Sequence, residues 1–304
     1  MNTVLCLGEA LIDVVHSPDG SVAEHVGGSP LNVAGGLSRL GHPTTLACWV
    51  AEDDHGDLIR EWLADHVVAM AAGSESAART ATAAATLDAH GQATYGFDIE
   101  WDLPPVDLAG VVHVHTGSIA AVLAPGADKV FDALGQAVAA GATISYDPNM
   151  RPALMGRPEL VRDRVEQIIA LADLVKASDE DIAWLYPGQD AGEVLQRWAG
   201  LGAGLVVMTR GGEGAAFVRG DDVVAVAPRR VSVGDTVGAG DSFMAGLVSG
   251  LLDAGLLGAG RGQLAAAGGA GAGIDAALDR AVAASALTVT RRGAYAPTRD
   301  ELQA

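Results

Sequence analysis

The chain has 304 residues, of which 49% are hydrophobic, so it has enough apolar material for a large folded core and is not intrinsically disordered. Its formal net charge of -19 at pH 7 disfavours nucleic acids and anionic membranes as partners, because both bind basic surfaces. One α/β domain with an appendage and two separate domains both fit this length.

The first residues carry no basic segment ahead of an apolar run, and no apolar stretch reaches bilayer length without a charge. We therefore expect a cytoplasmic protein with neither a secretion signal nor a transmembrane segment. Cys6 and Cys48 each lie in an apolar, strand-like run and show no metal-ligand spacing. We interpret both as reduced core residues.

Residues 3–8 form a continuous apolar run, which is typical of a strand that is covered on both faces of a largely parallel sheet. A polar segment with Glu9 and Asp13 follows. Ligands of open α/β sheets bind beyond the carboxyl ends of the strands, so Asp13 is a candidate ligand contact. A turn-capping role for Asp13 is equally compatible with its position.

Residues 14–26 predict a hairpin with a turn at residues 17–20, and a glycine-rich segment follows. Gly27 and Gly28 permit close approach of the backbone, and Pro30 suits a first helical turn. Asn32 would point back toward the glycines from that turn. Further along, residues 80–83 and 93–97 predict two strands around a polar turn at 88–91, which together with the hairpin could form a small separate sheet.

Four later segments predict buried strands that are followed by polar residues. Residues 111–118 place His113 and His115 on one face; a zinc site would need a third ligand, so we favour a structural or substrate-lining role. Residues 142–146 precede a polar cluster that contains Arg151, and residues 174–178 precede acidic residues that open a helix. Residues 205–209 precede a glycine turn at 210–214, which alone is a weak phosphate-loop signal.

The segment at residues 233–243 concentrates three glycines and two carboxylates immediately before an apolar run at helical spacing. This pattern predicts a turn whose N–H groups converge at a helix N-terminus, which is a suitable site for a phosphate group. Asp241 lies where a hydroxyl would have to lose a proton before attacking phosphorus. A glycine-rich connector with a capping Asp is the alternative interpretation. Residues 258–273, rich in Gly and Ala, indicate a flexible surface connection.

The order Asp-Thr-x-Gly-Ala-Gly-Asp-Ser-Phe at residues 235–243 closely resembles the signature of the ribokinase-like (PfkB) carbohydrate kinases, in which the last Asp is the catalytic base. The resemblance extends from Gly8 to Ala294 and is strongest to the fructokinases, through residues 8–13, 115–118, 147–151, 176–180 and 95–101. It implies a single kinase domain over residues 1–304. The fold would be a three-layer α/β/α sandwich with a mostly parallel central sheet and a small β-sheet lid formed by about residues 14–26 and 79–102.

The resemblance also implies the roles of individual residues. The catalytic set would be the base Asp241 with the anion hole Gly238, Ala239 and Gly240. The substrate sugar would contact Asp13, Gly28, Asn32, Phe97 and Arg151. The cofactor ATP would contact Thr209, Gly211, Gly214 and Lys176.

Metal ions and a second subunit are implied in the same way. Mg²⁺ would bridge the ATP phosphates and contact Asp181 through water, although Asp181 is one methylene shorter than the Glu of the family's Asn-x-x-Glu motif. Asp235 resembles a residue near a monovalent-cation site, which implies activation by K⁺. The partners would be a small-molecule sugar and ATP, with a homodimer formed through the lid.

Fructose is the expected sugar. Kinases for 2-keto-3-deoxygluconate often carry an Arg two residues after a lid Tyr, whereas here Tyr95 is followed at that interval by Phe97. An apolar ring suits a neutral sugar, because an unpaired substrate carboxylate beneath it would be costly to desolvate. Kinases for 2-keto-3-deoxygluconate or another furanose stay open as alternatives, with Arg79 and Arg151 as possible cations. A catalytically idle sugar-binding regulator is the alternative outside the enzymes.

Overall fold

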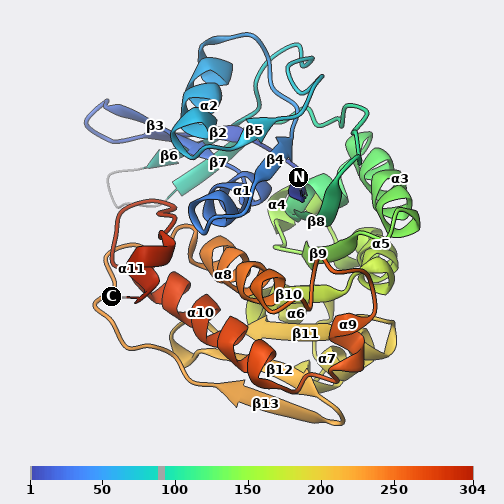
Figure 1. The fold of residues 1–304 in the computed structure, drawn as a ribbon. Helices are drawn as coiled ribbons and strands as arrows, with labels where there is room; N and C mark the ends of the chain where they lie inside the picture. Colours follow the sequence, from blue (N-terminus) through green and yellow to red (C-terminus); the bar gives the residue numbers. More distant parts are fainter. Residues whose placement is uncertain (1, 88–92, 304) are drawn as a thin grey trace.

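The computed structural model describes residues 2–87 and 93–303, which form two sheets and their covering helices (Figure 1). The larger sheet contains nine strands among these residues, in the spatial order β13 (Asp222–Val226), β12 (Ala215–Arg219), β11 (Leu205–Thr209), β10 (Leu174–Ser178), β9 (Thr143–Asp147), β8 (Val111–Gly117), β1 (Thr3–Leu7), β4 (Thr44–Ala47) and β5 (Ala69–Met70). Its strands pair in parallel from β5 to β11, and β12 and β13 continue the sheet in antiparallel pairing.

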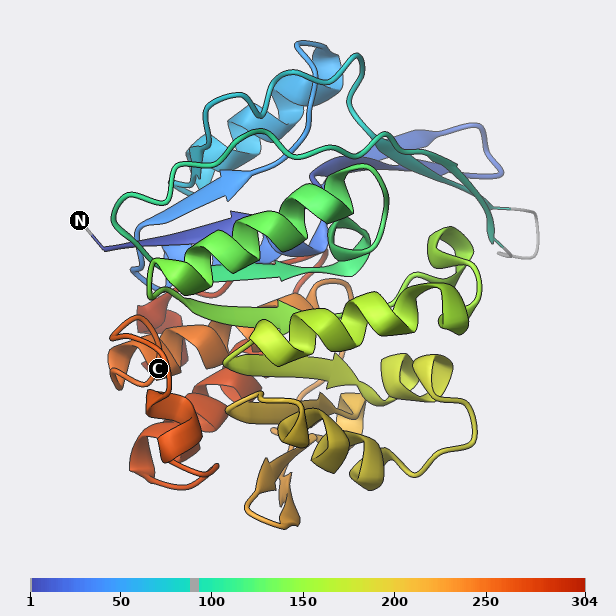
Figure 2. The ribbon, with the colours of Figure 1, turned by 90° about the vertical axis from the view of Figure 1, so that its right-hand side faces the viewer.

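Helices cover both faces of this sheet. The helices that pack on one face, in front of the sheet in Figure 2, are α3 (Gly126–Ala139), α5 (Pro158–Leu171), α6 (Asp179–Leu185) and α7 (Ala191–Gly200). The helices that pack on the other face are α1 (Ser29–Arg39), α2 (Asp54–Asp65), α8 (Ala239–Asp253) and α10 (Ala272–Thr288). The short segments are η1 (Ser118–Ala121), α4 (Pro152–Met155), η2 (Gly211–Glu213), α9 (Gln263–Ala266) and α11 (Arg299–Gln303).

The alternation of side chains along each strand divides the core between these two helical layers. In β1, Leu5 and Leu7 pack with the layer of α3 and α5, whereas Val4 and Cys6 pack with the layer of α1 and α8. Successive strand residues point to opposite faces, and both faces here are covered. This confirms the expected three-layer α/β/α fold with a mostly parallel sheet, and it explains why the strands read as continuous apolar runs.

The small sheet has the order β3 (Val22–Gly27), β2 (Leu11–His16), β6 (Thr82–Leu87) and β7 (Ala93–Asp98). Two antiparallel hairpins, β2–β3 and β6–β7, are joined by parallel pairing of β2 with β6. The predicted small sheet is therefore confirmed, and Figure 2 shows it projecting beyond the carboxyl end of β1. The turn predicted at 88–91 lies outside the described residues.

Three further expectations concern the cysteines, membrane-spanning helices and residues 258–273. Cys6 and Cys48 are buried and unpaired, as predicted. In the part of the chain that is described, no helix combines the length and the apolar character needed to cross a membrane. The prediction that residues 258–273 form only a surface connection was wrong in one respect, because Leu264 is 1% exposed and belongs to the core.

Candidate active site

The centre of the site is Asp241, in the first turn of α8, where the N-terminus of this helix meets that of α1. Its carboxylate is 9% exposed and accepts two hydrogen bonds, from Ser29 Oγ at 2.6 Å and from Asn32 Nδ2 at 2.8 Å. A carboxylate has about four acceptor positions, so two remain for other donors. Asp241 is therefore oriented by neutral donors and still able to accept a proton.

The turn that precedes Asp241 has the geometry of an anion site. Gly238 adopts a left-handed conformation with φ of 74°, and an added Cβ would lie 2.6 Å from Ala294 Cα, so only glycine fits. Within the described residues, the N–H groups of Gly238 and Gly240 have no backbone acceptor, whereas the N–H group of Ala239, also predicted in the anion hole, donates to the carbonyl of Thr236 at 3.2 Å. Free N–H groups at the start of a helix of 15 residues attract a phosphate group.

The last residue of α10 and the loop that follows it contact this turn and the start of α8. Thr288 Oγ1 contacts Ser242 Oγ at 2.7 Å and donates to the carbonyl of Tyr295 at 2.9 Å. The Asp235 carboxylate accepts from the N–H groups of Val237 at 3.1 Å and Gly293 at 2.8 Å. These hydrogen bonds lower the pKa of Asp235, with the Gly293 contact contributing most. Asp235 therefore stays ionised beside the anion site.

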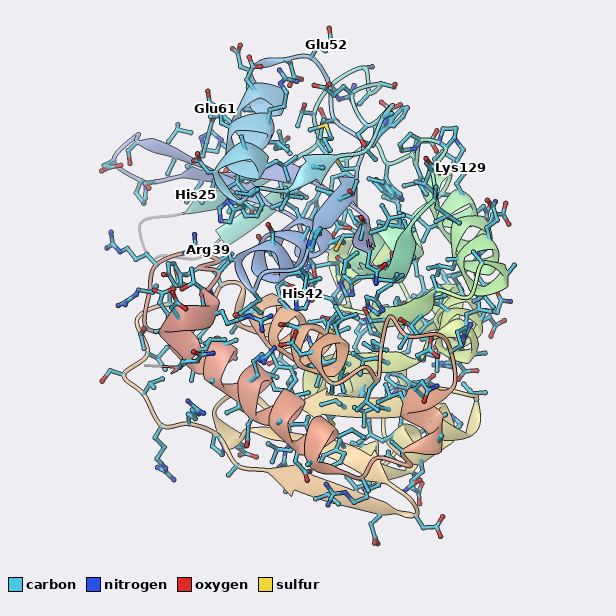
Figure 3. All side chains as sticks on the ribbon, viewed as in Figure 1. His25, Arg39, His42, Glu52, Glu61 and Lys129 are labelled. Carbon is cyan, nitrogen blue, oxygen red and sulfur yellow. The ribbon has the colours of Figure 1, made fainter. Side chains whose placement is uncertain are left out.

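Asp13 lies on the small sheet in a row of residues that are in register across its four strands. The row runs from His25 on β3 through Asp13 on β2 and Ala83 on β6 to Phe97 on β7. Residues paired in this way project from the same face. His25, at the β3 end of this row, is labelled in Figure 3. The residue between Asp13 and Phe97 in this row is the small Ala83, and Phe97 is 38% exposed.

The Asp13 side chain is exposed to solvent, but neighbouring protein atoms partly desolvate its carboxylate. Partial burial raises its pKa, and the charges of His25 and Arg151 oppose that effect. Arg151 is exposed, and its Nη1 donates to Asn149 Oδ1 at 2.7 Å and to the carbonyl of Met150 at 3.1 Å. Among the described residues Arg151 forms no ion pair, so its charge is free to act toward the side of the site that contains Asp13.

Gly28 joins the small sheet to α1, immediately after β3. Its φ is 122°, and an added Cβ would lie 2.3 Å from the carbonyl oxygen of Glu9. The polypeptide can therefore pass this closely only with glycine here. Glu9 itself is 5% exposed, and its Oε2 has no hydrogen-bond partner among the described residues. Burial raises the pKa of Glu9 to about 7, against the opposing effect of hydrogen bonds that include one from Ser118.

Three of the residues predicted on the nucleotide side lie at or just beyond the carboxyl end of β11. Thr209 ends β11, and Gly211 and Gly214 flank the short η2 segment. Lys176, in contrast, is not on the surface. Its side chain is 4% exposed and forms an ion pair of 2.7 Å with Asp147 at the end of β9.

Asp181 serves as part of a capping box at the start of α6. Its two carboxylate oxygens accept from the N–H groups of Ser178 at 2.8 Å and Met150 at 2.7 Å. The described residues contain no group of three or more side chains positioned to hold a metal ion.

The two histidines of β8 form part of a buried hydrogen-bond network. His113 contacts Thr143 Oγ1 and Ser145 Oγ, each at 2.8 Å, and His115 Nδ1 contacts Ser145 Oγ at 2.9 Å. Burial lowers the pKa of both imidazoles to about 3. Both rings are therefore neutral at physiological pH, and their contacts support the structural interpretation.

Sequence reasoning did not single out three residues in or beside the candidate site: Ser29, Glu9 and His25. Ser29 lies at the start of α1, where small polar residues commonly cap a helix, so nothing local indicated a contact with Asp241. The signal for His25 was its place in a hairpin opposite Asp13, which becomes informative only when the strand register is known.

The chain matches known proteins over nearly its whole length. Residues 1–301 match the pfkB family carbohydrate kinase. The chain is 36% identical to a fructokinase from Rhizobium leguminosarum bv. trifolii, with 82% of this chain and 79% of that protein covered. It is 33% identical to a fructokinase from Klebsiella pneumoniae, with 98% and 97% covered.

Two solved structures are similar over the full fold. The fructokinase with bound ATP from Xylella fastidiosa is 28% identical, with a TM-score of 0.84 and coverage of 99% of this chain and 97% of that one. A fructokinase double mutant from Vibrio cholerae O395, bound to fructose, ADP and a potassium ion, is 27% identical, with a TM-score of 0.81 and coverage of 100% and 97%.

Proposed function

The chain belongs to the pfkB family of carbohydrate kinases, and on that premise we propose that it is an ATP-dependent fructokinase. It would transfer the γ-phosphoryl group of ATP to a primary hydroxyl of fructose. The observation that carries the proposal is the buried Asp241 carboxylate, which Ser29 and Asn32 orient at the mouth of an anion-binding turn. Phosphoryl transfer needs a proton acceptor and an anion site in this relation.

In this reaction Asp241 accepts the proton of the sugar hydroxyl as its oxygen attacks the γ-phosphorus. The new oxygen–phosphorus bond forms as the bond to the β-phosphate oxygen breaks, and ADP leaves. The N–H groups of Gly238 and Gly240 would donate to the phosphoryl oxygens. Because the fold holds these donors in place before the reaction, they stabilise developing charge without reorganisation.

We assign the sugar to the space between the small sheet and α1. Asp13 would accept hydrogen bonds from sugar hydroxyls, and the Phe97 ring from the same row would cover the sugar. Asn32 must direct its NH₂ group toward Asp241, since a carboxylate only accepts, so its buried Oδ1, which lacks a partner, is left to accept from a hydroxyl. Gly28 provides the close backbone approach, and Arg151 the nearby positive charge. The small sheet would then act as a lid.

ATP would bind over the carboxyl ends of β10 and β11, along Thr209, Gly211 and Gly214. When bound, Mg²⁺ would supply positive charge that reduces the repulsion among the ATP phosphates. Asp181 fits this role only through water, because both of its oxygens already accept from backbone N–H groups. For K⁺ we propose a site beside Asp235, which is ionised and anchored to the anion turn. The Vibrio cholerae fructokinase structure with a bound potassium ion supports this proposal.

We further propose that two copies of the chain associate through the lid. Its outer strands, β3 and β7, are edge strands, and Val22 on β3 is 54% exposed. Exposed edges are potential pairing surfaces. Light scattering of the purified protein measures the association. A variant with Val22→Lys should yield monomers if the edge of β3 forms the contact, and an unchanged dimer would place the contact elsewhere.

The experiment that tests the function is an assay of ADP release with ATP, Mg²⁺ and a panel of sugars, with ³¹P NMR of the product. We expect turnover that depends on fructose and a phosphomonoester signal from the sugar. Fructose binding by calorimetry without any turnover would instead support the sugar-binding regulator. Turnover with another furanose alone would keep the kinase and change its substrate.

A further inference from the structure

Lys176 and Asp147 form a buried ion pair that the reaction described above does not use. The two residues lie on the neighbouring strands β10 and β9, their side chains are 4% and 0% exposed, and Nζ donates to Oδ2 at 2.7 Å. Burying two charges is costly unless the surroundings compensate for it. Asp147 Oδ1 has no partner among the described residues, so this compensation is incomplete within the pair.

The position of the pair is informative. An added Cβ on Gly240 would lie 3.2 Å from Lys176 Nζ, so the ammonium group lies directly against the turn that forms the anion hole. The charges of Asp241 and Asp181 also act on Lys176. Of the three hydrogens on the ammonium nitrogen, one is donated to Asp147, and the hydrogen bonds of the described residues include no second acceptor for it.

The charges of three carboxylates, Asp147, Asp181 and Asp241, thus act on Lys176, which lies against the turn that would receive the anionic triphosphate. Lys176 is the one buried lysine or arginine among the described residues. A fixed charge in a poorly solvated site acts more strongly than one in water. Its position beneath Gly240 aims that charge at the phosphoryl group that the turn would hold.

We propose that Lys176, fixed by Asp147, is an electrostatic positioning residue that stabilises the phosphoryl group from beneath the anion hole during transfer. This inference rests on the proposed kinase function and extends it to a residue pair that is buried beneath the site. The competing explanation is structural, with Lys176 serving only to neutralise Asp147.

The two explanations predict different activities for a double variant. Lys176→Met alone leaves Asp147 buried without its partner, so both stability and kcat should fall. Adding Asp147→Asn removes the stranded charge and should restore the thermal midpoint, and we expect kcat to stay lower by about 10²-fold, the scale of losing one oxyanion donor. The fructose KM should change by less than about threefold, since Lys176 lies on the phosphate side. Recovery of kcat together with stability would overturn the inference.

The chain supplies a matched control in its only other lysine. Lys129 pairs with Asp102 at 2.6 Å, but the two side chains are 52% and 23% exposed, and Figure 3 places Lys129 at the outer edge of α3. Lys129→Met should leave both kcat and the thermal midpoint unchanged. A loss of kcat in this variant would show that deletion of any lysine lowers activity.

A binding measurement adds a readout that a structural role would not change. Calorimetry with ADP, aluminium fluoride and fructose reports on a complex that imitates phosphoryl transfer. Its affinity should fall in the double variant by about the factor seen in kcat, with the affinity for ADP alone nearly unchanged. Equal affinities in wild type and double variant would contradict the inference. Wild-type protein without fructose turnover would refute the fructokinase proposal instead, and the comparison would then use the sugar that turns over.

Discussion

Asn32 and Asp241 are 209 residues apart in the chain and are joined by a hydrogen bond of 2.8 Å between the amide Nδ2 and the carboxylate Oδ2. Through this contact the first turn of α1 fixes the orientation of a carboxylate in the first turn of α8. Asn32 also carries a buried Oδ1 without a partner in the described part of the chain. One side chain can therefore orient the base and accept a substrate hydroxyl at the same time.

Replacing the base should separate chemistry from binding. Asp241→Asn keeps the size of the side chain and removes its ability to accept a proton in the transition state, so kcat should fall by at least about 10²-fold. Fructose affinity, measured by calorimetry, should change little. A variant with near-normal kcat would show that another group takes the proton.

Replacing Asp13, the proposed sugar anchor, should weaken fructose binding. Asp13→Ala removes a charged acceptor, and hydrogen bonds to charged groups contribute about 1.5–3 kcal/mol, so the fructose KM should rise by roughly tenfold or more. The ATP affinity of the free enzyme should be unaffected, because Asp13 lies on the small sheet. If calorimetry finds that the variant has lost ATP binding and kept sugar binding, the assignment of sugar and ATP to the two halves of the site is the wrong way round.

The monovalent cation provides a third prediction. Asp235 is ionised and linked to the anion turn through Val237 N–H, so K⁺ beside it should favour phosphate binding. Replacing KCl by tetramethylammonium chloride at equal ionic strength should lower kcat/KM for ATP, and Asp235→Asn should raise the K⁺ concentration needed for half-maximal rate. Equal rates in both salts would exclude the proposed site.

Glu9 should make stability depend on pH. Burial raises its pKa from 4.5 to about 7, so the folded protein binds the proton more tightly than the unfolded chain does. The stability contributed by the protonated group is therefore present at low pH and is lost as the pH rises from about 4.5 to about 7.

Glu9→Gln cannot titrate and should escape this loss. Relative to wild type, the free energy of unfolding of the variant should increase by roughly 3 kcal/mol between about pH 4 and pH 8, the equivalent of this pKa shift. Urea denaturation at several pH values measures the difference. Parallel stability curves for the two proteins would mean that Glu9 is ionised in the folded state at neutral pH.

The larger sheet could be predicted from sequence because its strands are buried on both faces and therefore read as continuous apolar runs, such as residues 3–7 and 205–209. The anion turn could be predicted because its glycines and Asp241 are adjacent in the chain. In both cases the residues that determine the structure are adjacent in the chain or follow a regular sequence pattern.

The contacts between distant segments could not be predicted in this way. The hydrogen bond from Ser29 to Asp241 spans 212 residues, and the ion pair of Lys176 with Asp147 depends on which strands become neighbours. Lys176 was expected on the nucleotide side, and its burial follows from its position inside β10 rather than from its chemical type. The row that contains His25, Asp13 and Phe97 likewise requires the register of four strands.

The choice of sugar depends on where positive charge is available near the substrate. Arg79 is paired with Asp98 at 2.6 Å, so its charge is already partly neutralised. Arg151 has no acidic partner within the described residues, and its charge acts on Asp13. If a substrate carboxylate binds, Arg151 is therefore the first residue to replace, with Arg79 as the control.

The most direct measurement is the ratio of kcat/KM for fructose to that for 2-keto-3-deoxygluconate, determined with ATP and Mg²⁺ under identical conditions. We predict that fructose is favoured by at least about tenfold, equivalent to roughly 1.4 kcal/mol in transition-state binding, because Phe97 presents an apolar ring where an acidic sugar would need a cation. Equal or reversed values would contradict the assignment of fructose as the substrate.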